Sequence, residues 1–155
     1  MKVQHHVAIS MVLAGTFGGI LQSWTVAAGV FLMGVFIDID HVFDYFIQLG
    51  PEFNIRRFFH ASYQRGYPKA FLILHAWEWA VIWAGIAYLT GFHLFFVGIL
   101  MGFIQHMILD QIFNRPHEFG YSFFWRLFNK FDFDRTFPLE HWPELRHLRV
   151  SDRSQ

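Results

Sequence analysis

The stretch FHLFFVGILMGFIQHMILDQI, residues 92–112, decides the fold class expected for this chain. It is an apolar run with the length that a membrane-spanning helix needs, which is about 20 residues. His106 and Asp110 lie near its end, four residues apart, so on a helix they share one face. Burying an ionisable side chain in apolar surroundings costs several kcal/mol unless the group is paired or binds a metal. The stretch therefore predicts a membrane helix that carries part of a polar site.

Further apolar segments precede this one. Residues 7–37 contain no charged side chain, and their length predicts two helices with a break near Gln22–Trp24. Residues 70–90 form a third apolar segment, which ends at Gly91 and whose first helical turns are expected to hold His75 and Glu78. Gly15 with Gly19 and Gly98 with Gly102 have the spacing that lets helices pack closely, although chance explains either pair equally well. We expect an all-α fold with a four-helix transmembrane bundle.

The chain is expected to form a single domain, with residues 1–112 as its helical core and residues 113–155 as an interfacial tail. In the tail, aromatic residues alternate with Arg126, Asn129 and Lys130, which predicts an amphipathic helix at the membrane surface. A monotopic or soluble helical bundle with an apolar core is the alternative.

Composition narrows the function classes. Hydrophobic residues make up 54% of the chain and charged residues 15%, against about 45–50% and 25% in soluble domains. Basic and acidic residues are equal in number at 12 each, so charge indicates no nucleic-acid partner. The absence of cysteine excludes disulfides, thiolate zinc sites and a cysteine nucleophile. A removable signal peptide is disfavoured, because the apolar run continues to Ile37 and cleavage would discard His5 and His6.

Basic residues set the expected topology. They precede the first apolar segment, lie between the second and third, and follow the fourth: Lys2, Arg56, Arg57, Arg65, Lys69 and Arg115. The two short turns between the paired segments carry none. Under the positive-inside tendency, both termini face the cytoplasm.

This topology brings the acidic and imidazole groups of all four segments to the same, cytoplasmic end. The candidate metal ligands are His6, Asp38, Asp40, His41, His60, His75, Glu78, His106 and Asp110. Nitrogen and carboxylate ligands together suit zinc or a similar divalent ion, and their number indicates two or three ions. His60 is equally well interpreted as a phosphate contact or a loop residue, and Asp44 either extends the acidic face or is solvated. Metal pairs of this kind suit phosphate-ester hydrolysis.

Roles follow from this chemistry. Glu78 or Asp40 would move protons, and Arg56, Arg57 and Arg65 would hold a phosphate group. Glu78 is also open to interpretation as a metal ligand, or as an ion-pair partner of Arg56 or Arg57.

Three motifs carry a resemblance to a known family: His6-Val-Ala-Ile-Ser10, Ile37-Asp38-Ile39-Asp40-His41 and Gly102-Phe-Ile-Gln-His106-Met-Ile-Leu-Asp110. They resemble the YdjM-like, membrane-bound predicted metal-dependent hydrolases over roughly residues 4–110. The resemblance implies a helical protein of the bacterial inner membrane, remotely similar to zinc-dependent phospholipase C. The family's His-Arg-Gly-x-Thr-His-Ser stretch is absent, so His60, His75 and Glu78 are inferred from chemistry and position alone.

The leading hypothesis is an integral membrane, zinc-dependent hydrolase of a phosphate ester, acting on a phospholipid or a lipid-linked phosphate. The first rival is a non-catalytic membrane protein that binds haem or conducts metal ions or protons. The second is a structural membrane protein whose polar residues pair only with one another.

Overall fold

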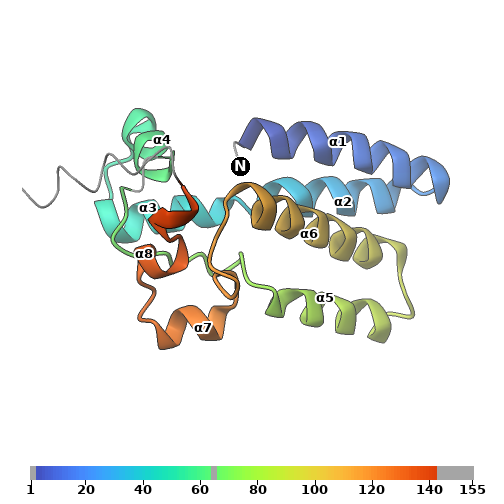
Figure 1. The fold of residues 1–155 in the computed structure, drawn as a ribbon. Helices are drawn as coiled ribbons and strands as arrows, with labels where there is room; N and C mark the ends of the chain where they lie inside the picture. The colour runs from blue at the N-terminus through green and yellow to red at the C-terminus, as the bar shows by residue number, and fades with distance from the viewer. Residues whose placement is uncertain (1–2, 64–65, 143–155) are drawn as a thin grey trace, which may run out of the picture.

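The computed structural model describes residues 3–63 and 66–142, and within this range the regular elements are all helices, joined by irregular segments, with one isolated bridge between Lys69 and Asp132. Four helices lie side by side in a bundle (Figure 1): α1 (Val3–Ile20), α2 (Trp24–Phe36), α5 (Glu78–Leu89) and α6 (Leu94–Phe113). Helix α6 packs against α2 and α5, and α1 packs against α2 and α6. The predicted all-α class is confirmed.

The first two helices divide where the sequence predicts. Helix α1 ends at Ile20, and Gln22 adopts a positive φ of 49°, which breaks the helical path. Ser23 then caps α2, because its Oγ accepts a hydrogen bond from Val26 N at 3.4 Å. A serine cap of this kind satisfies one of the free amides at the start of a helix.

Glycines let α2 and α6 approach each other closely. A Cβ added to Gly98 would lie 2.5 Å from Val26 O, and one on Gly29 would lie 2.5 Å from Phe95 O. Gly102 packs in the same way against Val30 O. The close-packing interpretation of the Gly98–Gly102 pair is therefore confirmed. A Cβ on Gly15 or Gly19 would meet nothing within 4 Å, so the other pair has no packing role within the described chain.

The third apolar segment is only partly helical. Helix α5 begins at Glu78, and residues 70–77 form an irregular segment that leads into it. The expectation that His75 lies in the first turn of this helix is therefore wrong. The reason is that aspartates of α3 (Ile39–Leu49) accept hydrogen bonds from the backbone amides of this segment: Asp44 accepts from Phe71 N, and Asp40 accepts from Leu74 N.

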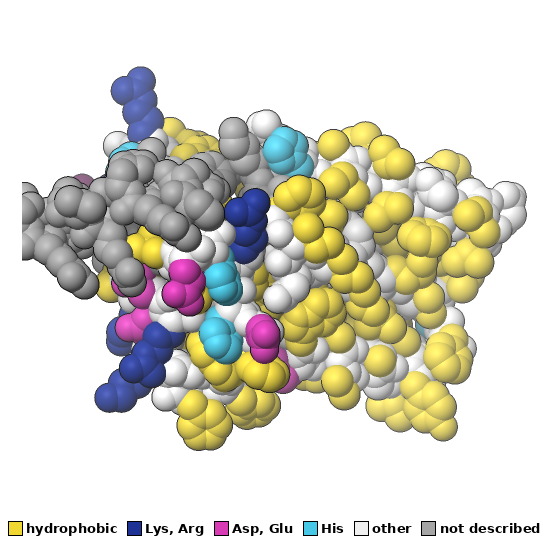
Figure 2. Space-filling model, in the orientation of Figure 1, with side chains coloured by type: hydrophobic (Ala, Val, Ile, Leu, Met, Phe, Trp, Pro, Cys, Tyr) yellow, Lys and Arg dark blue, Asp and Glu magenta, His cyan; other side chains and the backbone are white. Residues whose placement is uncertain are grey.

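The remaining elements gather at one end of the bundle (Figure 1). They are α3 (Ile39–Leu49), α4 (Ile55–Tyr63), α7 (Phe123–Phe128), α8 (Phe133–Thr136) and the short 3-10 helix η1 (Leu139–His141). Figure 2 shows charged and histidine side chains concentrated over this polar end, while hydrophobic side chains cover the bundle. Large apolar side chains face outward from the bundle, such as Trp24, Val81 and Leu89, which is 82% exposed.

Two helical stretches of the described chain, Trp24–Leu49 and Leu94–Phe113, are long and apolar enough to cross a membrane. Helix α5 has 12 residues and extends about 18 Å, which is shorter than the ~30 Å of a bilayer core. In α1, His5 and His6 reduce the apolar character of the first turns. Among the residues described, two stretches are therefore candidate membrane spans by length and composition, and the expected four-helix transmembrane bundle is not confirmed.

Candidate metal centre

The site begins at the end of α6, where His106 and Asp110 lie one turn apart and are both buried. The Nδ1 atom of His106 lies 2.9 Å from Gly34 O on α2. Because a carbonyl oxygen only accepts, this contact places the proton on Nδ1 and leaves Nε2 free as a ligand. Gly34 also lets α1 and α6 lie close to α2 here, since a Cβ there would overlap Ser10 Oγ and lie 2.9 Å from Gln105 Oε1.

His75 faces His106 from the segment before α5. Its Nδ1 lies 3.2 Å from Asp40 Oδ2, and the same oxygen accepts the amides of Leu74 at 2.7 Å and His75 at 3.2 Å. The Nε2 atoms of His75 and His106 are 3.2 Å apart. A carboxylate behind an imidazole is the usual means of orienting a metal-binding histidine. Asp40 therefore positions His75 and shapes the segment that carries it.

Two carboxylate oxygens complete a compact set around these nitrogens. Asp38 Oδ1 lies 3.5 Å from both Nε2 atoms, and Asp110 Oδ2 lies 3.5 Å from that of His75 and 3.6 Å from that of His106. Zinc–ligand bonds of about 2.0–2.1 Å give a tetrahedron with edges of about 3.3–3.4 Å. In the five pairs given, these four atoms, which we call the central donor set, therefore have the spacing of ligands around a tetrahedral metal ion.

Two more histidines flank the central donor set. His6 Nε2 lies 2.9 Å from Asp110 Oδ1, and its ring stacks on that of His106 with centroids 3.9 Å apart. His41 Nε2 lies 3.8 Å from Asp38 Oδ1. The candidate ligands thus form two groups that share Asp38: His6, Asp38, His106 and Asp110, and Asp38, His41 and His75. A buried group of histidines and aspartates that could hold a metal ion is confirmed.

The unpaired atoms of this group indicate the same chemistry. Among the described residues, the buried atoms Asp38 Oδ2 and His6 Nδ1 have no hydrogen-bond partner. A buried carboxylate oxygen without a partner is costly, and a cation is what would compensate it. The donor set of imidazole nitrogens and carboxylate oxygens fits zinc or a similar divalent ion.

The proton on His75 competes with a metal ion for the central donor set. Burial lowers the pKa of His75, but its contacts with Asp38 and Asp40 outweigh this effect and raise the pKa to about 10. A proton on His75 therefore compensates the carboxylates at neutral pH. An ion that binds the Nε2 atom would replace that proton.

Arg126 supports the segment that holds His75. Its side chain is fully buried, with Nη1 donating to His75 O and Gly120 O at 2.9 Å each and Nη2 donating to Leu72 O at 2.8 Å. The sequence interpretation placed Arg126 on the polar face of a surface helix, which is wrong because the guanidinium points inward. The sequence holds no signal for this role, since the carbonyls it binds belong to an irregular segment.

Glu78 lies away from the two ligand groups. Its Oε1 accepts the Ser122 hydroxyl at 2.6 Å and its Oε2 accepts Phe123 N at 3.1 Å. These bonds hold the first turn of α7. Burial raises the pKa of Glu78, but the hydrogen bonds from Ser122 and from backbone amides lower it by more. The pKa of Glu78 therefore lies below its ordinary value. The structure therefore gives Glu78 a capping role and does not bring it to the predicted position of metal ligand or base.

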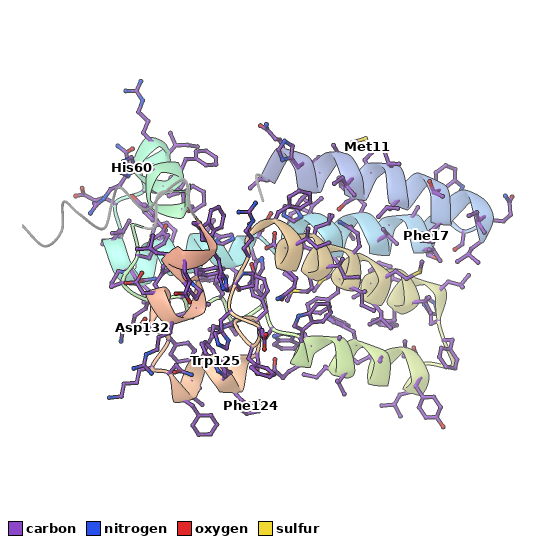
Figure 3. The ribbon with its side chains drawn as sticks, viewed as in Figure 1. Met11, Phe17, His60, Phe124, Trp125 and Asp132 are labelled. Atoms are coloured by element: carbon purple, nitrogen blue, oxygen red, sulfur yellow. The ribbon has the colours of Figure 1, made fainter. Side chains whose placement is uncertain are left out.

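The other sequence-based candidates on α4 also lie apart from these groups. Arg56, Arg57 and His60 are exposed on α4, and Figure 3 shows His60 at the polar end of the molecule. Arg65 lies outside the described residues. None of the three described side chains belongs to either ligand group.

A cavity of about 380 Å³ adjoins the site. One wall is formed by Asp38, which is the N-cap residue of α3, and by His41 and Asp44 within that helix. Aromatic side chains dominate the remaining lining, among them Phe58, Phe113, Tyr121, Phe133, Phe137 and Trp142. Asp38 and His41 thus connect the metal group to a space of the size that small ligands occupy.

Known proteins supply no family assignment. No family model, curated protein or solved structure matches this chain. Function is therefore inferred from the geometry of the site and from the motifs that carry the YdjM-like resemblance.

Proposed function

We propose that this protein is an integral membrane, metal-dependent hydrolase of a phosphate ester, with zinc as the metal, as its resemblance to YdjM-like hydrolases implies. The observation that carries the proposal is the spacing of the central donor set beside an aromatic cavity. His75, His106, Asp38 and Asp110 come from three separate parts of the chain, yet their donor atoms lie 3.2–3.6 Å apart in each measured pair.

A divalent ion bound there would activate a water molecule and stabilise the departing oxygen. The protein's own residues prepare the site for this role. Gly34 and Asp40 orient His106 and His75, and Tyr121 donates to Asp110 Oδ2 at 3.4 Å. Asp38 and His41 face the cavity, so the substrate would meet the site along this wall of α3.

Asp38 and His41 of the other ligand group could hold a second ion, whereas the Nε2 atom of His75 already belongs to the central donor set. Asp38 is common to both ligand groups: its Oδ1 belongs to the central donor set, and its Oδ2 has no hydrogen-bond partner among the described residues. A pair of ions would supply the water activation and leaving-group stabilisation of two-metal hydrolases.

The bundle would lie in the membrane with the polar end at the cytoplasmic surface. The apolar exterior of α2, α5 and α6 supports this placement, as do the charged side chains gathered at the other end (Figure 2). Both chain termini would then face the cytoplasm, in agreement with the distribution of basic residues. Arg56 and Arg57, exposed on α4, would contact anionic lipid headgroups rather than the reacting phosphate.

Haem binding, the first rival hypothesis, does not suit this geometry. Axial histidines coordinate haem iron from opposite sides of the ring plane. The Nε2 atoms of His75 and His106 face each other at 3.2 Å, which leaves no room for iron and porphyrin between them.

Metal content tests the proposal. We expect the purified chain to hold zinc, and His106→Ala and Asp110→Ala to lose most of it together with any phosphodiesterase activity. His60→Ala is the matched control, because His60 is a predicted ligand that the structure places on the exposed face of α4. Elemental analysis of the three variants provides the measurement. Stoichiometric metal in both His106→Ala and Asp110→Ala would overturn the assigned site.

A further inference from the structure

Helix α7 has an apolar outer face, although it belongs to the polar end of the molecule. Phe124, Leu127 and Phe128 are three and four residues apart, so they lie on one side of the helix. All three are exposed, and Phe128 is 84% exposed. Figure 3 shows Phe124 at the outer edge of α7, and Figure 2 shows hydrophobic side chains at this edge of the polar end. We call these three side chains the α7 patch.

The opposite side of α7 faces the interior. Arg126 is fully buried there and donates to the carbonyls of His75 and Leu72. The ring of Phe123 packs against that of Phe131, with centroids 5.9 Å apart. Helix α7 therefore contacts the segment that carries a candidate metal ligand on one side and presents an apolar surface on the other.

The start of α7 lies within the depth of the apolar bundle. Trp77 N donates to Tyr121 O at 2.9 Å, so α5 and α7 begin beside each other. Just before this point, His75 faces His106 of α6 with Nε2 atoms 3.2 Å apart. From His106, α6 continues to Phe113, which is about 10 Å further along the helix. The first turn of α7 is therefore level with a part of α6 that lies inside a candidate membrane span.

Helix α7 also supplies the length that α5 lacks. The 12 residues of α5 and the 6 residues of α7 extend in opposite directions from their common starting point (Figure 1). Together they cover about 27 Å, close to the ~30 Å of a bilayer core. Residues 79–89 contain no charged residue, and outward side chains such as Val81 and Leu89 are exposed. The α7 patch therefore continues the apolar outer face of α5.

Two lysines lie close to the end of the α7 patch. Lys130 follows α7, and the isolated bridge joins Lys69 to Asp132; both lysine side chains are exposed. Lysines at the edge of an apolar surface can reach lipid phosphates while their carbon chains stay in apolar surroundings. Asp134 is exposed nearby as well, so the local charge is mixed, and the apolar side chains carry the argument.

We propose that α7 is a lipid-contacting helix, whose patch lies among acyl chains just below the headgroups and completes one membrane-facing surface with α5. Because Arg126 lies on the same helix, this lipid contact also holds the His75 segment in place for metal binding. The inference rests on the membrane placement in the proposed function. It goes beyond that placement by assigning a helix of the polar end to the lipid.

Spin labels on single cysteines test the lipid contact. The full chain is reconstituted in vesicles of phosphatidylethanolamine and phosphatidylglycerol, with the label at Phe128→Cys or Leu127→Cys. Oxygen concentrates in lipid, whereas a charged nickel chelate stays in water. We expect the ratio of oxygen to nickel accessibility to be at least about threefold higher for both labels than for Asp134→Cys, which is exposed on α8. Val81→Cys on α5 is the lipid-facing control.

The possible results separate lipid from the other occupants of the patch. A ratio for Phe128→Cys equal to that of Asp134→Cys would mean that water covers the patch, and would overturn the inference. A label that neither reagent reaches would mean that protein covers it, such as a second copy of this chain, and would also overturn the inference. A water-like ratio for Val81→Cys would overturn the membrane placement itself, and this inference with it.

A substitution on the patch tests the link to the metal site. In the same vesicles, Phe128→Ser should lower zinc affinity by about threefold or more, because Arg126 on the inner side of α7 is then held less firmly. Leu89→Ser is the matched control, since Leu89 is similarly exposed but lies at the far end of α5. Unchanged zinc affinity in Phe128→Ser would overturn the link to the metal site. A chain that takes up no zinc overturns the proposed metal site, whereas the spin labels still decide where α7 lies.

Discussion

Arg126 shows how a single residue outside the ligand groups can determine their geometry. Its guanidinium is buried without a carboxylate in hydrogen-bond contact within the described chain, and its Nη donors go to the carbonyls of Leu72 and His75 and to that of Gly120 in the turn before α7. Burial lowers the pKa of Arg126, against the opposing effect of Tyr121 and nearby acids. Burying the charged guanidinium costs free energy, and its hydrogen bonds to backbone carbonyls offset part of that cost. These bonds hold a segment that has no regular secondary structure.

Replacing Arg126 should therefore weaken metal binding. We expect Arg126→Met to lower zinc affinity by about 10–100-fold, the range typical of residues that orient metal ligands, and Arg126→Lys to restore part of it. Competition with a zinc chelator measures the affinity. Arg135→Met is the control, since Arg135 is exposed on α8 and contacts only Asn129 through its side chain among the hydrogen bonds found. A purely structural role for Arg126 would lower thermal stability while leaving the zinc affinity of the folded protein intact.

At the scale of elements, the two glycine pairs behave differently although their sequence spacing is the same. Gly98 and Gly102 face the backbone of α2, whereas Gly15 and Gly19 face open space. The pattern predicts that a helix can pack closely on that face, but only the neighbouring helix decides whether it does.

This difference makes a matched pair of substitutions. Gly102→Ala should destabilise the protein by about 1–3 kcal/mol, because its Cβ would overlap Val30 O in the contact between α2 and α6. Gly19→Ala should be neutral or stabilising by about 0.5–1 kcal/mol, because alanine favours a helix and meets nothing there. Thermal unfolding in detergent measures both. Equal effects of the two variants would contradict the close contact between α2 and α6.

The capping role of Glu78 predicts a pH dependence. Its pKa is lowered on folding from the ordinary 4.5, so its contribution to stability is present above that value and is lost as the pH falls through the folded pKa. Glu78→Gln should cost about 1–2 kcal/mol at neutral pH through weaker bonds to Ser122 and Phe123 N.

The free energies of unfolding of the original chain and of Glu78→Gln should therefore become similar as the pH falls. Unfolding curves between neutral pH and pH 3 measure this, and Glu118→Gln, exposed elsewhere, provides the comparison. A constant difference between the original chain and Glu78→Gln across this range would show that the carboxylate charge is not what holds α7. Loss of bound zinc in Glu78→Gln would instead favour the role predicted from the sequence.

Much of the fold follows from the sequence because apolar periodicity and caps act locally. The break before Ser23 and the shared face of His106 and Asp110 are of this kind. The irregular segment 70–77 could not be predicted, because it exists only where Asp40 and Asp44 of α3 accept its amides. His75 was identified by its chemistry, although its expected helical setting was wrong for the same reason. The roles of Arg126 and Glu78 depend on that long-range arrangement too.

At the scale of the whole molecule, the site lies at the boundary between an apolar bundle and a polar end (Figures 1 and 2). The helix pair α2–α3 passes this boundary, so the acids of α3 lie beyond the apolar part of the bundle. Helix α6 ends at Phe113, just after Asp110. A hydrolase built in this way would reach a substrate at the membrane surface without drawing its charged phosphate into the bilayer core.

Impermeant thiol labelling can test this placement in the membrane, and the absence of native cysteine makes single-cysteine variants unambiguous. Arg57→Cys on α4 should react only after spheroplasts are permeabilised, whereas Thr90→Cys, in the turn at the opposite end of the bundle, should react from outside. Val81→Cys, on the outward face of α5, should resist labelling in both cases because lipid covers it, although it is 75% exposed in the isolated chain. Reaction of Val81→Cys as fast as Arg57→Cys in permeabilised cells would mean that water covers the bundle. In that case the apolar exterior would belong to a protein contact, and the membrane placement would be wrong.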